Sequence, residues 1–200
     1  MMGMTHVFVG TMSAVMLTEL NSPRDCLAAL IGGALGAGAC DMDLGRNDHR
    51  RDATLARRTA AAVALVCLAL DAWLDAGLIR WTRGVPAHTL AAGLAVGAVL
   101  CLWGRCQPHR GATHSLLMTL LLGMCMKCIC APLSIPLMIG MGSHLALDML
   151  NRRPVQLLYP LRGGVSLGLC RADGRLDRML RIAGLLGTVF GLGMGIGGFL

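Results

Sequence analysis

The sequence predicts an all-α membrane protein, a helical bundle with about five to seven membrane segments and a polar site at its cytoplasmic face. Hydrophobic residues make up 55% of the chain and charged residues only 14%, whereas roughly 25% of a typical soluble domain is charged. The apolar residues form several long runs, and the 27 glycines suit helices that pack closely within a membrane. The length favours one membrane-embedded domain that covers residues 1–200.

The first two apolar stretches, residues 6–20 and 26–40, predict a hairpin that enters the membrane and returns. Between them, Ser22 is suited to cap a helix and Pro23 to occupy its first turn. The later apolar runs predict five further segments: 59–79, 89–104, 116–130, 133–147 and 182–200. A break at two prolines separates 116–130 from 133–147.

Two carboxylates lie towards the far end of the 59–79 run. Asp71 and Asp75 are one helical turn apart, and Asp75 is within reach of Arg80 for an ion pair. Asp71 has no such partner in the sequence. It is therefore the residue that would favour a path for protons or ions.

Arginine supplies almost all of the formal net charge of +7, since Lys127 is the only lysine. A basic chain can indicate nucleic-acid binding, but these arginines lie between apolar runs and aromatic residues make up only 4%. We therefore expect lipid contact and no nucleic-acid partner. The arginine-rich loops are 46–58, 105–110 and 151–181. If successive segments alternate in direction, these loops share one face, which the positive-inside rule places in the cytoplasm.

Three polar clusters and one histidine fall on that same face. They comprise Asp41-Met42-Asp43, the stretch from His109 to Ser115, the stretch from Ser143 to Asp148, and His6 after Thr5. His144 and Asp148 are four residues apart, so a helix presents both on one side. Mixed histidine and aspartate ligands suit zinc, manganese or iron. The sequence thus predicts a metal site at the mouth of the bundle.

Each of these residues also has a simpler interpretation. A single histidine at a membrane edge is commonly an interfacial residue or a helix cap, and Asp148 could pair with Arg152 or Arg153. Arg110 could hold a substrate phosphate or contact a lipid headgroup. Thr113 and Ser115 could orient histidines by hydrogen bonding.

The combination of motifs resembles the YdjM family of inner-membrane proteins, described as metal-dependent hydrolases. The motifs that carry the resemblance are Thr5-His6, Asp41-x-Asp43, His109-Arg110-Gly111-x-Thr113-His114-Ser115 and Gly142-Ser143-His144-x-x-x-Asp148. Residues 154–161 and 166–169 are also similar to the family's C-terminal half. The family's first aspartate motif typically begins Leu-Pro-Asp, where this chain has Ala39-Cys40-Asp41, so the local geometry differs there.

The resemblance implies a multi-pass protein of the inner (plasma) membrane and a metal-dependent hydrolase, acting on a phosphoester or lipid-linked substrate. We expect a divalent ion, zinc first and manganese or iron as alternatives, with Asp41 or Asp43 as general base and Arg110 on the phosphate. The candidate metal ligands are His6, Asp41, Asp43, His109, His114, His144 and Asp148. The alternatives are a non-enzymatic protein that binds or transports metal ions or protons, and a structural membrane protein without a metal.

Overall fold

The computed structural model describes residues 2–43, 50–170 and 174–198, and for residues 50 and 51 the backbone alone. Part of the first arginine-rich loop, with Arg46, Asp48 and His49, therefore lies outside the described residues, as does Arg171.

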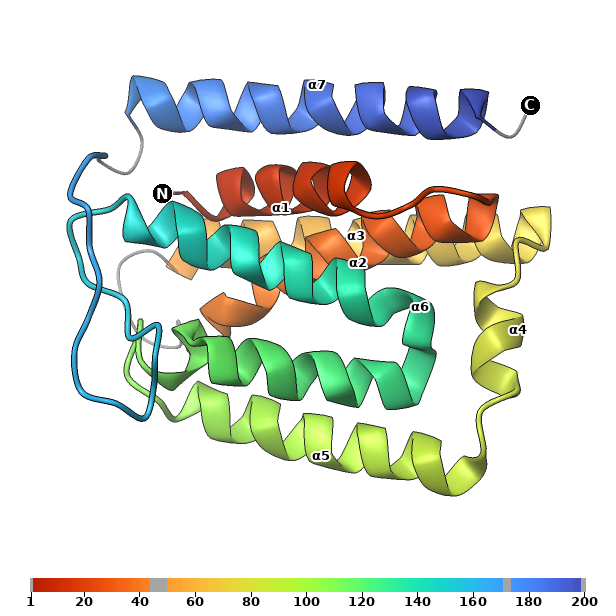
Figure 1. The fold of residues 1–200 in the computed structure, drawn as a ribbon, viewed down its shortest axis with the longest axis horizontal. Coiled ribbons are helices and arrows are strands. Elements are labelled where there is room, and N and C mark those ends of the chain that lie inside the picture. The colour runs from red at the N-terminus through yellow and green to blue at the C-terminus, as the bar shows by residue number, and fades with distance from the viewer. Residues whose placement is uncertain (1, 44–49, 171–173, 199–200) are drawn as a thin grey trace.

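Helices that alternate in direction make up the fold, as the sequence predicts (Figure 1). They are α1 (Gly3–Leu17), α2 (Pro23–Ala39), α3 (Arg50–Leu74), α4 (Leu78–Arg83), α5 (Ala87–Arg105), α6 (Leu116–Met149) and α7 (Arg175–Gly197), with short 3-10 helices η1 (Cys40–Asp43) and η2 (Ala112–His114). Within the described ranges, β structure is limited to two isolated bridges. Five of these helices, α2, α3, α5, α6 and α7, are long and apolar enough to cross a membrane.

The helix α6 turns back on itself near its middle, so its two ends lie at the same end of the bundle (Figure 1). Cys130 has non-helical φ and ψ angles, and Pro132 and Pro136 follow it. The hydroxyl of Ser134 donates a 2.7 Å hydrogen bond to the carbonyl of Gly123, which ties the two halves together. The predicted pair of segments, 116–130 and 133–147, is therefore present as two antiparallel helical halves of α6 that meet at Cys130.

The centre of the bundle is a close contact between α2 and the second half of α6. A Cβ atom on Gly36 would overlap the backbone carbonyl of Leu137, and one on Gly140 would overlap the carbonyl of Gly33. Glycine at these positions lets the two backbones meet. As a result, the C-terminal end of α2 lies beside the last turns of α6.

The third segment ends earlier than the sequence predicts, at Leu74 and not at residue 79. Gly77, with φ of 101°, turns the chain into α4. The carboxylate of Asp71 accepts hydrogen bonds of 2.7 Å from the backbone N–H groups of Leu78 and Ile79. Asp71 thus caps α4, which accounts for its burial without an ion path. Asp75 forms the expected ion pair with Arg80, at 3.4 Å.

Candidate metal centre

The fold brings all seven predicted ligands to one end of the bundle, opposite α4. Each comes from the end of a helix or from a connection at that end (Figure 1). They are His6 in α1, Asp41 and Asp43 in η1, His109 before η2, His114 in η2, and His144 and Asp148 in α6. All are buried except His109, whose side chain is 23% exposed.

The turn before α6 places His114. Arg110 adopts φ of +66°, and its carbonyl accepts a hydrogen bond from the N–H of Gln156. Ser115 caps α6, since its hydroxyl accepts a 3.1 Å hydrogen bond from the N–H of Met118 and donates to the carbonyl of Ala112. Ser115 therefore acts on the backbone around His114, whereas the sequence suggested that it could orient a histidine ring directly.

Asp41, His114 and His144 form a group whose spacing could hold a metal ion, and Asp148 faces both of these histidines. The Nε2 atom of His114 lies 3.8 Å from Oδ1 of Asp41 and 3.5 Å from Oδ2 of Asp148. The Nε2 atom of His144 lies 3.7 Å and 3.8 Å from the same two oxygens. These separations are too long for hydrogen bonds. Ligand atoms around a tetrahedral zinc ion are about 3.4 Å apart, given bond lengths near 2.1 Å.

Hydrogen bonds on the other ring nitrogens aim both Nε2 atoms into this space. Nδ1 of His144 is 2.7 Å from the carbonyl oxygen of Ala37, which can only accept, so Nδ1 carries the proton. Thr113 donates its hydroxyl to Asp43 at 2.6 Å, so its oxygen is available to accept from Nδ1 of His114 at 3.0 Å. Neither Nε2 has a hydrogen-bond partner among the described residues, although both are buried. Two buried lone pairs directed at two carboxylates fit a cation.

The carboxylate of Asp148 presents a different oxygen to each side. Its Oδ1 accepts 3.0 Å hydrogen bonds from Nη2 of Arg110 and from Nδ2 of Asn151, and Oδ2 faces the two histidines. Among the residues that the structure describes, the arginine in contact with Asp148 is Arg110 and not Arg152 or Arg153. Nη1 of Arg110 in turn donates to the carbonyl of Arg153 at 2.6 Å. Sequence reasoning missed Asn151, whose position three residues after Asp148 is the signal that could have identified it.

His6 lies against the four-atom cluster from α1. Its ring stacks on that of His144, with centroids 3.8 Å apart, and its Nε2 is 3.5 Å from Oδ1 of Asp148. These three residues form one of the groups whose spacing could hold an ion. The start of α1 is itself fixed by two carboxylates that the sequence did not point to, Asp52 and Asp177, which accept from the N–H groups of Gly3 and Met2.

Asp43 and His109 form a second layer outside the cluster. Nδ1 of His109 is 2.9 Å from Oδ1 of Asp43, and Oδ2 of Asp43 is 3.4 Å from Nδ1 of His114. These three residues could hold an ion, but the hydrogen bonds from Thr113 and His109 already occupy both carboxylate oxygens. The arrangement suits a carboxylate that orients a histidine ligand.

Electrostatics at His114 reflect this crowding of carboxylates. Burial lowers the pKa of His114, but the close approach of the Asp43 carboxylate and the negative charges of Asp148 and Asp41 outweigh burial. The pKa of His114 is therefore raised above its ordinary value. The surrounding carboxylates therefore stabilise positive charge on the His114 ring.

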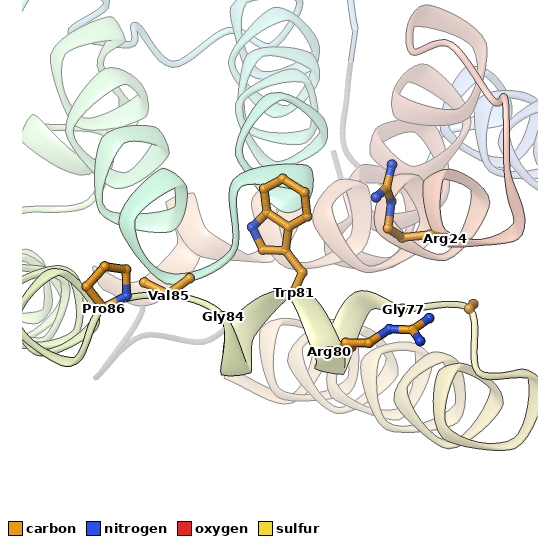
Figure 2. Close-up of a pocket in the computed structure, with 8 residues that line it drawn as sticks. Arg24, Gly77, Arg80, Trp81, Gly84, Val85 and Pro86 are labelled. Atoms are coloured by element: carbon orange, nitrogen blue, oxygen red, sulfur yellow. The ribbon is translucent and has the colours of Figure 1, made fainter.

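Two cavities of about 510 Å³ each lie elsewhere. Figure 2 shows the first, which borders α4 and is lined in part by Arg24, Arg80 and Trp81. The guanidinium of Arg24 lies 5.6 Å from the centre of the Trp81 ring. The second lies between the end of α1 and α7. Neither is lined by a candidate metal ligand.

Comparison with known proteins identifies a family that matches most of the chain. The model of the family described as YdjM inner membrane protein matches residues 1–186, most of the chain. Neither a curated protein nor a solved structure matches this chain. The family and the five candidate spans agree with a multi-pass protein of the inner membrane. The chain belongs to the YdjM inner membrane protein family.

Proposed function

We propose that this protein is a membrane-bound, metal-dependent hydrolase whose centre is the cluster at the end of the bundle. The observation that carries the proposal is the set of four ligand atoms, from His114, His144, Asp41 and Asp148, at 3.5–3.8 Å separations. Mixed nitrogen and oxygen ligands favour zinc, with manganese or iron as alternatives. A bound divalent ion would supply a Lewis acid that polarises the scissile bond and activates water.

The four residues divide into three ligands and a base. Catalytic zinc sites keep one position open, with three protein ligands. His114, His144 and Asp148 have side chains that are at most 3% exposed, whereas that of Asp41 is 11% exposed. We assign the three buried side chains as ligands. Asp41, on the more open side, accepts the proton of the attacking water.

The substrate proposed is a phosphoester, either a lipid or a lipid-linked molecule. The centre lies where several apolar helices end, at the level expected for lipid headgroups. Arg110 lies beside Asp148, and its Nε atom is buried without a hydrogen-bond partner among the described residues. That N–H group is suited to a phosphate oxygen.

Elemental analysis of the detergent-purified protein tests the centre. We expect stoichiometric zinc, manganese or iron in the wild type, and its loss in His144→Ala. His88→Ala is the matched control, because His88 is exposed at the start of α5, away from the cluster. Absence of metal after reconstitution with zinc and manganese, or equal metal in wild type and His144→Ala, would contradict the proposal.

Activity is tested separately, with bis(p-nitrophenyl) phosphate and with vesicles of phosphatidylglycerol as substrates. We expect hydrolysis by the metal-loaded wild type. Asp41→Asn should keep its metal and lose hydrolysis, because it retains the fold and removes only the base. Full activity in this variant would exclude the role of Asp41, and loss of its metal would make Asp41 a fourth ligand.

A further inference from the structure

A non-helical segment, residues 152–169, is fixed across the end of the bundle that carries the metal centre (Figure 1). The carbonyl of Leu157 accepts a hydrogen bond from the N–H of Leu116, and the N–H of Leu167 donates to the carbonyl of Met149. Val155 is fully buried in the same hydrophobic cluster as Met118 and Leu145. The segment therefore has a defined inner face that packs on the helices.

Its outer face combines large apolar side chains with arginines. Leu158, Leu161, Leu167 and Leu169 are 58%, 67%, 58% and 73% exposed. The arginines of this face are exposed as well: Arg152, Arg153 and Arg162. In the described part of the chain, no carboxylate is in ion-pair contact with their guanidinium groups. A surface of this kind suits a partner that is apolar and anionic at once.

The segment also lies at the level where a membrane would end. It begins three residues after α6 ends at Met149, and its Tyr159 ring is 6.3 Å from the ring of Trp103, near the end of α5. Tryptophan and tyrosine are enriched at the boundary between lipid and water. This position beside the Trp103–Tyr159 pair favours contact of the exposed leucines with the surface of a bilayer.

We propose that segment 152–169 is an interfacial element that binds the anionic lipid surface on the arginine-rich side of the membrane. The leucines insert between acyl chains, and Arg152, Arg153 and Arg162 contact headgroup phosphates. This surface adjoins the metal centre, since Arg153 contacts Arg110 and Asn151 contacts Asp148. Lipid binding by the segment does not depend on the proposed hydrolysis, so the two proposals fail separately.

A tryptophan reporter tests the insertion. Trp73, Trp81 and Trp103 are replaced by Phe, and Leu161→Trp is introduced into the full chain, with Leu169→Trp as a second reporter. Leu186→Trp, a position 63% exposed within α7, is the lipid-facing control. In proteoliposomes of phosphatidylcholine and phosphatidylglycerol, brominated acyl chains should quench both reporters about as strongly as the control, and iodide should not. Quenching of both reporters by iodide, with none by brominated lipid, would overturn the insertion.

The anionic component is tested by charge removal. Quenching of the Leu161→Trp reporter should increase with the phosphatidylglycerol fraction, and Arg152→Gln, Arg153→Gln and Arg162→Gln together should abolish this increase. The matched control removes three arginines at the opposite end, with the substitutions Arg24→Gln, Arg80→Gln and Arg83→Gln, and should retain it. Quenching that is independent of phosphatidylglycerol, or equally reduced by both triple variants, would overturn the assignment of an anionic lipid partner.

Discussion

The substitution Thr113→Val tests whether the second layer orients a metal ligand. The hydroxyl of Thr113 donates to Oδ2 of Asp43 at 2.6 Å and is placed to accept from Nδ1 of His114 at 3.0 Å. Valine has nearly the same shape but removes both hydrogen bonds. His114 then loses the contact that holds its Nε2 atom towards Asp41 and Asp148, and Asp43 loses its shortest hydrogen bond.

The expected effect is a loss of metal affinity without a loss of the site. Removal of an outer-layer partner typically reduces metal affinity about 10- to 100-fold, which corresponds to about 1.4–2.8 kcal/mol. The measurement is a competition titration of detergent-purified protein against a chromogenic chelator, with zinc as the probe. The folded protein should still bind the ion, because His114, His144 and Asp148 are all present.

Thr119→Val is the matched control for this prediction. Thr119 is also buried, and its hydroxyl donates a 3.0 Å hydrogen bond to the carbonyl of Ser115, within α6. Both variants lose buried hydrogen bonding, each bond contributing about 1 kcal/mol, but only Thr113→Val should lower the affinity for zinc. An unchanged affinity in Thr113→Val, or an equal loss in both variants, would refute the orienting role.

Three further predictions concern the cap, the far end and pH. Ser115→Ala should lower the unfolding free energy by about 1 kcal/mol, because α6 loses its N-cap, and it should also weaken zinc binding. Thermal unfolding measures the first effect and the chelator titration the second. An unchanged zinc affinity would contradict the role of Ser115 at the site. Asp71→Asn should destabilise the protein to a similar extent but leave its metal content unchanged, since Asp71 caps α4 at the opposite end; loss of metal would revive an ion path. Zinc affinity should rise with pH and level off only above the ordinary histidine pKa of about 6.5. The reason is that the raised pKa of His114 lets protons compete with zinc for Nε2 up to a higher pH. Asp43→Asn should move this plateau to lower pH, and a pH-independent affinity would exclude proton competition.

Sequence reasoning and structure agree on the order and direction of the helices. The apolar runs and the arginines between them carry this information along the chain, because the length of a run and the charge at its ends are local properties. The pairing of residues 116–130 with 133–147 is also local, since Pro132 and Pro136 mark the break. The predicted end of the third segment at residue 79 is wrong. The helix ends at Leu74 because Asp71 caps α4, and this cap depends on the fold around Gly77.

The sequence by itself determined an all-helical membrane protein and the end of the bundle at which the seven candidate metal ligands gather. Only the tertiary structure decided which of them face one another. Asp41 and His114 are far apart in the chain and lie within 3.8 Å. Likewise, Asp43 contacts His109 and Thr113 and lies on the Nδ1 side of His114, opposite the Nε2 atom that faces Asp41 and Asp148. The physical reason is that these contacts depend on the close approach of α2 and α6 at Gly36 and Gly140. The spacing Gly32-x-x-x-Gly36 marks a helix face suited to close packing but does not identify the helix that packs on it.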